Sequence, residues 1–432
     1  MPKNQTQLNI KTNLSPELHF LIACCQADPS KDLALNADTP VVKTKEGCNA
    51  LLGLAHQHGI LPLVYKTLKR LSETEKMENP VGLAVPNVYG KSESATNETN
   101  PFTPLLSDLK HFYMSIVQKN MLMTSELLRI MKLFEENGIE ALAFKGPALA
   151  QVAYGDITLR QYGDLDILIH RKDFRNIASL MQEKGYTPHY PIETFSGDKV
   201  MFEMNNDCPF YDRSRGLATE IHWDFFRKLA LPTKGFSPWE NTETVIINGK
   251  AVQTLSPEAH LLYHALHGAK HVWERLVWIV DIDRFIRAVP DIDWVKTIKM
   301  AKGMGAEKMF FSGIALAQRY FHTPLPDDIR LRCQALELEP FITYVESELG
   351  SDSPAAEDSL TKLSKVIGLR DNPYYKTMTL LAFLFRPGIN ERRMVILPDS
   401  LFWLYWLLRP AGMVYRFIFC RSMKLCKTDA EA

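Results

Sequence analysis

Two aspartates in an apolar run, Asp164 and Asp166 of the segment GDLDILI, are the residues best suited to chemistry in this sequence. In a β-strand, residues i and i+2 point to the same face, so we expect the two carboxylates to project together. Leu165 and Ile167 would then face the other way. Two like charges side by side repel unless a cation lies between them. Oxygen ligands suit Mg²⁺, which often binds one or two carboxylates together with substrate phosphates. The pair therefore predicts metal-assisted phosphoryl or nucleotidyl transfer, and the alternative is an exposed strand that carries two solvated acids.

Two further segments supply groups that such a site needs. Lys145, Gly146 and Pro147 follow a predicted strand and precede a predicted helix. Glycine lets the backbone approach a ligand, and a helix start offers unpaired N–H groups and a positive dipole end to phosphate. Glu220 lies in the alternating segment TEIHW, where it can complete a two-metal site as a third carboxylate. The alternatives are an ordinary turn and an ordinary strand acid. His222 shares the face of Glu220 and either contacts substrate or pairs with a neighbouring carboxylate.

The order of these motifs resembles the DNA polymerase β-type nucleotidyltransferase superfamily. A glycine turn between strand and helix comes first, then two acids spaced by one residue, then a third acid in a later strand. More narrowly, the segments FKGPALAQVAYGDITLRQYGDLDILIHRKDF and HGAKHVWERLVWIVDIDRF are similar to the family of uncharacterised nucleotidyltransferases. The resemblance covers residues 20–320 in broad terms.

This resemblance implies an enzyme that moves a nucleoside monophosphate from an NTP to a hydroxyl acceptor. ATP is the expected NTP, and Mg²⁺ or Mn²⁺ is the expected cofactor. The acceptor is left open between a small molecule, a sugar and a protein side chain. Asp164, Asp166 and Glu220 are then the catalytic metal ligands, and Lys145 and Gly146 form the turn on the phosphate side.

Arg160 lies four residues before Asp164 and would brace a phosphate through two parallel hydrogen bonds. The alternative is a salt bridge to Asp156 or Asp164. The chain departs from the wider superfamily at Gly146-Pro147, where Gly-Ser or Gly-Gly is usual. Proline has no N–H to donate, and the contact of a serine hydroxyl is lost. A second hypothesis is therefore a catalytically inactive nucleotide-binding or scaffold protein on the same fold.

Four histidines, His260, His264, His267 and His271, are spaced for one face of a helix. Histidines at i and i+4 can bind Zn²⁺, but the neighbouring leucines indicate a helix packed on the core. We expect His267, Lys270 and His271 to line the nucleotide or acceptor cleft. Zinc binding and ordinary packing are the alternatives.

Composition and patterning place these motifs in an α+β fold. The chain has 432 residues, of which 46% are apolar and 23% charged, enough for a sizeable core. We predict an N-terminal helical region, a small mixed-sheet nucleotidyltransferase core and a helical C-terminal domain. Their ranges are 1–110 with a loop at 76–104, 111–255 and 256–432. The expected strands of the core are 139–144, 164–170, 199–204, 210–212 and 218–223, followed by a hairpin at 245–254.

Charge and cysteine usage bear on partners and location. Fifty basic and fifty acidic residues cancel, so net charge does not indicate nucleic acid as a partner. The seven cysteines form no CxxC pair, and the first residues hold no apolar signal segment, which favours a cytoplasmic protein. From residue 370 onward, ten Lys/Arg stand against five Asp/Glu among several aromatic residues. A peripheral membrane contact through residues 399–427 is one expectation, and a buried C-terminal helix is the other. The oligomeric state is left open.

Overall fold

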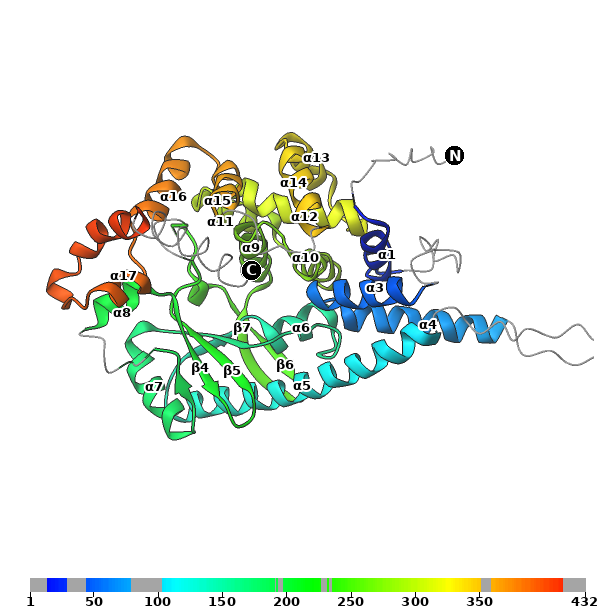
Figure 1. The fold of residues 1–432 in the computed structure, drawn as a ribbon, viewed down its shortest axis with the longest axis horizontal. Coiled ribbons are helices and arrows are strands. Elements are labelled where there is room, and N and C mark those ends of the chain that lie inside the picture. The colour runs from blue at the N-terminus through cyan, green and yellow to red at the C-terminus, as the bar shows by residue number, and fades with distance from the viewer. Residues whose placement is uncertain are drawn as a thin grey trace, which may run out of the picture.

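A computed structural model describes residues 14–28, 44–78, 103–190, 192, 197–226, 231–232, 235–350 and 359–414. It confirms the α+β class, because five strands form one mixed sheet and helices precede and follow it (Figure 1). The expectations for residues 1–13, for most of the loop at 76–104 and for residues 415–427 lie outside the described residues. Within the described ranges, no helix is both long enough and apolar enough to cross a membrane.

The N-terminal region is helical, as its apolar periodicity predicts. Ser15 caps the first helix by accepting a hydrogen bond from the Leu18 N–H, and Pro16 occupies its first turn. The longest helix stops before Gly138, whose φ of 67° is left-handed, as the Asn-Gly signal indicates. The helices of this region are α1 (Pro16–Cys24), α3 (Lys45–Gln57), α4 (Leu61–Glu78) and α5 (Thr103–Glu136).

Helix α5 joins the two halves of the hydrophobic core. Leu105 and Leu109 in its first half pack with α1, α3, α4 and the C-terminal helices. Leu127, Ile130 and Phe134 in its second half pack with the strands instead. Figure 1 shows the helix in cyan, running along the lower side of the molecule from α4 to β4 and β5. It passes through residue 110, where the predicted N-terminal region ends, and the predicted division into three parts stays a prediction.

The sheet places acids on one face and apolar residues on the other. Its strand order is β1-β2-β5-β4-β3, with β2 and β5 parallel and all other neighbours antiparallel. Leu165, Ile167 and Ile221 enter the core that holds the second half of α5. Because side chains alternate along a strand, Asp166 and Glu220 lie on the opposite face. The strands are β1 (Ala141–Ala143), β2 (Leu165–Ile169), β3 (Thr187–Pro188), β4 (Asp207–Asp212) and β5 (Leu217–His222).

One strand prediction in the core is wrong. Residues 199–204 form helix α8 (Asp198–Met204) instead of a strand. The Asp399 carboxylate accepts hydrogen bonds from the N–H groups of Lys199 and Val200 and so caps this helix. Asp399 lies far along the chain from α8, so the local pattern of residues 199–204 could not predict this cap. The other core helices are α6 (Gly146–Tyr154) and α7 (Phe174–Glu183), with the 3₁₀ turns η1 (Arg171–Asp173) and η3 (Pro238–Glu240).

The predicted hairpin and the helix after it are confirmed. Strands β6 (Thr242–Ile247) and β7 (Lys250–Leu255) turn at Asn248 and Gly249, which both have positive φ, as a tight hairpin requires. Ser256 then caps α9 through the Ala259 N–H, with Pro257 in the first turn. The helices from this point onward are α9 (Pro257–Lys270), α10 (Leu276–Ala288), α11 (Trp294–Gly303), α12 (Glu307–Phe321), α13 (Asp327–Ala335), α14 (Glu339–Leu349), α15 (Ser359–Gly368), α16 (Pro373–Phe385) and α17 (Ile389–Met394). A 3₁₀ turn η5 (Asp399–Leu401) and a helical stretch over 404–414 end the described chain.

A buried carboxylate ties α5 to the far end of the sheet. Glu126 accepts hydrogen bonds from Arg129 and Tyr186, and from Arg215 at 2.6 and 3.1 Å. Burial by itself would raise the pKa of Glu126, but these donors outweigh it and hold the pKa at about 2. Arg215 lies in the turn between β4 and β5 and Tyr186 lies just before β3, so this group joins three elements.

We expect Glu126→Gln to lower the free energy of unfolding by roughly 2 kcal/mol at pH 7, because the variant leaves buried donors without a charged acceptor. The folded-state pKa lies below the ordinary value of 4.5, so the wild-type advantage is present above pH 4.5. It disappears as the pH falls toward about 2. Urea unfolding at pH 7, 4 and 3 measures both effects.

The matched control is Glu136→Gln on the same helix, where the carboxylate makes an exposed pair with Lys132 at 3.5 Å. Exposed pairs contribute about 0.5 kcal/mol or less, so this variant should unfold like the wild type. Equal losses in the two variants would contradict a stabilising role for the Glu126 network.

Candidate active site

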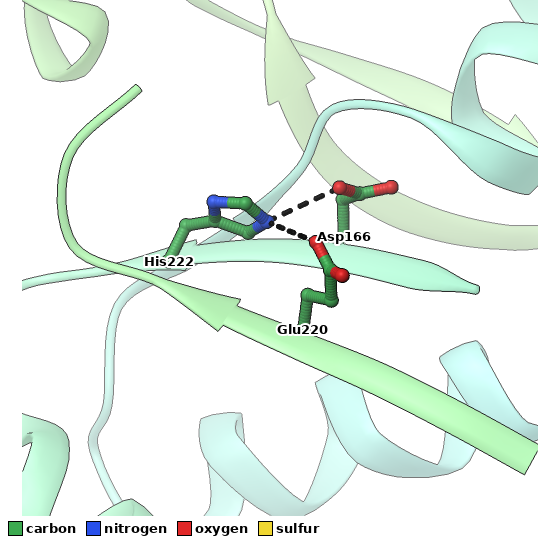
Figure 2. A group of neighbouring side chains, drawn as sticks. All are labelled: Asp166, Glu220 and His222. Atoms are coloured by element: carbon green, nitrogen blue, oxygen red, sulfur yellow. Dashed lines mark hydrogen bonds and ion pairs between the residues drawn. The ribbon is translucent and has the colours of Figure 1, made fainter. Parts of the chain in front are cut away.

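Two neighbouring parallel strands bring three polar side chains together. Asp166 on β2 is in register with Glu220 on β5, and His222 lies two residues further along β5. Figure 2 shows the His222 ring on one side of the two acids, with its Nε2 directed at both, 3.1 Å from Asp166 Oδ1 and 3.2 Å from Glu220 Oε2. Across the described part of the chain, these three form the one group of three or more His, Cys, Asp or Glu residues with ligand atoms within 4.8 Å of one another. His222, for which the sequence indicated two roles, is a partner of both carboxylates.

Asp164 lies at the margin of this group. It precedes Leu165, where β2 begins, and its side chain is half-buried. Burial raises the pKa of Asp164 to about 6, and the nearby charges of Asp166 and Glu220 add to that shift. The acid that directly faces Asp166 is therefore Glu220, and Asp164 is close enough to feel both charges.

Lys145 neutralises the buried carboxylate of Asp166. Its Nζ donates a hydrogen bond to Asp166 Oδ1 at 2.8 Å and lies 5.7 Å from the ring centres of Phe144 and Tyr263. Burial opposes a charge on Lys145, but Asp166 outweighs burial and raises the pKa of the ammonium group. The lysine is therefore held charged at the start of α6.

The same balance governs Asp166 and His222. Burial would raise the pKa of Asp166, but Lys145 and the hydrogen bond from His222 hold it well below its usual range. Burial would lower the pKa of His222, but its hydrogen bonds to Asp166 and Glu220 raise it to about 9. Two cationic groups thus offset the carboxylates in a site largely removed from water.

The turn at Gly146 requires glycine. Gly146 has a φ of 51°, and a Cβ there would lie 3.3 Å from the carbonyl oxygen of Asp164. Pro147 sits in the first turn of α6, where a helix leaves N–H groups unpaired, so the proline fits the fold. The N–H of Ala148 already bonds to the Lys145 carbonyl at 3.2 Å. An anion at this turn would therefore meet the ammonium group of Lys145 and the start of α6. That helix start has one backbone N–H donor fewer than usual, because Pro147 has none.

Arg160 is paired with a residue that sequence reasoning did not consider. Its Nε and Nη2 donate to the two oxygens of Asp281 at 2.8 and 2.9 Å, and both side chains are buried. Tyr154 Oη donates to Asp281 as well, at 2.7 Å. A salt bridge was one of the two expectations, but its partner is neither Asp156 nor Asp164. Asp281 lies on α10, so this pair ties the loop before β2 to the C-terminal helices.

Helix α9 lies near the site through its histidine face. His267 is half-buried and stacks on Tyr263 with ring centres 5.8 Å apart. Burial and the charge of Lys145 hold the pKa of His267 well below its ordinary value. His271 follows the last residue of the helix and contacts Trp278, while Lys270 is exposed. Burial and nearby cations, Lys145 among them, also lower the pKa of His271 to about 3. The charge of Lys145 thus reaches both histidines that were expected to line a cleft.

The other two histidines of this face are packed inside. His260 Nε2 lies 2.8 Å from Thr254 Oγ1, and His260 Nδ1 lies 3.4 Å from His264 Nε2. Burial lowers the pKa of His260 to about 3, so its ring is neutral. Neither residue belongs to the ligand group described above, and ordinary packing is the alternative that these contacts support.

Asp207 is an acid near the site that the sequence reasoning missed. It is in register with His222 on the neighbouring strand, at the start of β4. Burial and the charges of Glu220 and Asp166 raise its pKa against the influence of His222. The expected strand begins at residue 210, so Asp207 lies outside it, whereas β4 begins at Asp207. The alternation in DCPFYD was the available signal.

A comparison with protein families agrees with this geometry. Residues 44–322, more than half of the chain, match the family described as "Uncharacterised nucleotidyltransferase". The chain belongs to this family. No curated protein matches it significantly. Among solved structures, an antigenic nucleotidyltransferase-like protein from Paracoccidioides brasiliensis aligns over 47% of this chain and 96% of its own, at 16% identity and a TM-score of 0.29.

For this nucleotidyltransferase family member, we expect Gly146→Ala to lower the free energy of unfolding by more than about 1 kcal/mol. A left-handed residue with a Cβ costs about that much, and the close approach to the Asp164 carbonyl adds to it. Gly155→Ala, at the other end of α6, is the matched control. Gly155 has a φ of 65°, but a Cβ at this position would meet no atom within 4 Å.

The difference between the two variants isolates the contact with Asp164. Urea unfolding gives the stabilities, and Mn²⁺ titration followed by electron paramagnetic resonance reports on the acids. Gly155→Ala should leave Mn²⁺ binding as in the wild type, whereas Gly146→Ala should weaken it. Identical behaviour in both assays would show that the turn does not position Asp164.

Proposed function

We propose that this protein is a metal-dependent nucleotidyltransferase that moves NMP from an NTP to a hydroxyl acceptor. The observation that carries the proposal is the in-register pair of Asp166 and Glu220 on parallel strands, beside the start of α6. Acids on adjacent strands, next to a helix N-terminus and a lysine, can hold a cation and a polyphosphate side by side. Family membership supports the same class of reaction.

The donor set fits a divalent cation. The carboxylates of Asp166 and Glu220 have oxygens within 4.8 Å of each other, and oxygen ligands of this kind suit Mg²⁺ or Mn²⁺. His222, which is cationic beside them, is their hydrogen-bond partner and is not counted as a ligand. Asp166 and Glu220 would hold one ion, and Asp164 at the margin would serve a second ion in a two-metal arrangement. Such ions, when bound, neutralise the triphosphate and lower the pKa of the attacking hydroxyl.

The remaining residues of the site bind and orient. Lys145, which neutralises Asp166 in the described structure, would be released to contact phosphate oxygens. Arg160 keeps its bidentate pair with Asp281, so its role is to hold the loop before Asp164 in place. His267, stacked on Tyr263, would line the nucleotide or acceptor side. ATP is the proposed donor, and the acceptor is a small molecule, a sugar or a protein side chain.

The second candidate is a nucleotide-binding or scaffold protein without catalysis. It is favoured by Pro147 in the first turn of α6, which removes one backbone donor from the phosphate side. It is favoured also by the cationic partners on Asp166, which leave the acid neutralised without a metal. Binding without turnover would follow if these partners stayed in place.

The proposal is tested with α-labelled NTPs, Mg²⁺ or Mn²⁺, and cell extract as the source of acceptors. The wild type should transfer label, and the Asp164→Asn, Asp166→Asn double variant should lose about a hundred-fold or more of the rate, because metal ligands supply several kcal/mol of transition-state stabilisation. Glu243→Gln, an exposed acid on β6, is the control and should behave as the wild type. Transfer that survives in the double variant would refute the assignment.

Calorimetry with Mg-ATP separates the two candidates. Saturable binding together with label transfer supports the enzyme. Saturable binding with no transfer for any of the four NTPs, with both cations and several extracts, supports the non-catalytic protein instead. The same titration on the double variant should show weaker binding in either case, because the acids bind the nucleotide through the cation.

A further inference from the structure

The C-terminal segment is fastened to the sheet domain through one of its faces. Asp399 caps α8, as described above, and places η5 beside it. Phe402 and Tyr405 are buried with Met201 of α8 in the hydrophobic core that also holds the second half of α5. Lys199 Nζ lies 5.5 Å from the ring centre of Phe402. The segment is thus held in a fixed position on the body of the protein.

Polar contacts on the same inner face fix the loop before it. Tyr405 Oη donates to the Val395 carbonyl at 2.9 Å and accepts from the Leu397 N–H at 2.8 Å. Arg409 Nη1 lies 3.1 Å from the buried carboxylate of Glu391 on α17. The Tyr405 hydroxyl and the Arg409 guanidinium are therefore directed inward, toward the protein.

The outward face of this helical stretch is apolar. Trp403, Leu407 and Val414 are 57%, 63% and 57% exposed, and Ala411 between them is exposed as well. Spacings of 4, 4 and 3 residues place these side chains on one stripe of a helix. A stripe that faces water on a surface helix is normally polar, so this one is reversed. Figure 1 shows the segment in red at the left end of the molecule, away from α1 and α3.

More apolar surface adjoins the stripe. Met394, Val395 and Ile396 are three consecutive exposed apolar residues, and Ile396 is 67% exposed. The hydrogen bonds of Tyr405 keep this loop against the helical stretch. Leu401 is exposed just before Trp403. We name Met394–Ile396, Leu401, Trp403, Leu407 and Val414 together the C-terminal apolar face.

Charge identifies what covers this face. From Ser400 to Thr428 the sequence contains no Asp or Glu and five cationic residues. Arg409 is already paired with Glu391, which leaves Arg416, Arg421, Lys424 and Lys427 as cations close to the face in sequence. A protein partner would leave most of these charges to be matched by acids of its own. An anionic bilayer matches them without specific pairs, and aromatic and aliphatic side chains insert between its headgroups. A helical stretch with an apolar stripe on one side, in a sequence segment that carries cations and no acids, therefore fits a lipid surface.

We propose that the C-terminal apolar face binds the surface of an anionic lipid membrane, with residues 404–414 lying in the plane of the headgroups. The contact is peripheral, because none of the described helices is suited to cross a bilayer. It holds the sheet domain at the membrane through the contacts of Asp399, Phe402 and Tyr405. The face lies outside the candidate active site, so this proposal is independent of nucleotidyl transfer.

Flotation of the full chain with vesicles tests the proposal. One set of vesicles contains phosphatidylcholine alone, and the other contains phosphatidylcholine with phosphatidylglycerol at roughly 7:3 to mimic an anionic leaflet, each in low and in high salt. The wild type should float with the anionic vesicles and less so in high salt, because screening weakens the charge attraction. Trp403→Ser with Leu407→Ser should lower the partition coefficient by about ten-fold or more, since two inserted apolar side chains are lost.

The control replaces two other exposed apolar residues, Val295→Ser with Leu331→Ser, on α11 and α13. It should float as the wild type does. Circular dichroism and urea unfolding verify that both double variants remain folded, as expected for side chains that face water.

Any one of four outcomes would overturn the proposal. The wild type would fail to float with anionic vesicles, or it would float equally well with neutral ones. The Trp403/Leu407 variant would float as the wild type does. In the last outcome, sedimentation velocity would show that the wild type forms dimers, that the Trp403/Leu407 variant does not, and that vesicles bind neither protein. The face would then join two copies of the chain.

Discussion

Neutralisation of one buried carboxylate organises the candidate site. Asp166 is the second residue of the buried strand β2, between Leu165 and Ile167, where an unpaired charge would cost several kcal/mol. Lys145 and His222 compensate it at 2.8 and 3.1 Å. These contacts bind the β1–α6 turn and the end of β5 to β2. The β1–α6 turn, β2 and β5 are therefore held together by contacts that neutralise the charge of Asp166.

A second buried ion pair extends that constraint to the helical part of the chain. Arg160, in the loop that leads into Asp164, is held by Asp281, which also accepts a hydrogen bond from Tyr154. The arginine lies in the loop before β2 and Asp281 lies on α10, so this buried ion pair connects the sheet region to the C-terminal helices. Asn120 on α5 adds to it by donating to the carbonyl of Arg160 at 2.8 Å. The acids thus occupy a junction between two cores, and α5 contributes to both.

The same chain carries two surfaces with opposite character. The junction is charged and largely buried. The C-terminal apolar face is exposed, is followed by a segment without acids up to Thr428, and is anchored through Asp399 and Tyr405. Both surfaces rest on contacts between residues far apart in the chain.

Local patterns in the amino-acid sequence were enough to establish the α+β class, the acid-bearing strands and the glycine turn, because alternation, helix caps and turn residues act over a few positions. Asp166 and Glu220 were identified from such patterns, and so was the hairpin at Asn248-Gly249. Which charges meet became known from the three-dimensional fold: Asp281 with Arg160, His222 with Asp166, and Asp399 with the start of α8. The fold also settled that one face of the C-terminal helical stretch is buried and the other exposed. Those outcomes depend on partners tens to hundreds of residues away, whose approach no local spacing encodes.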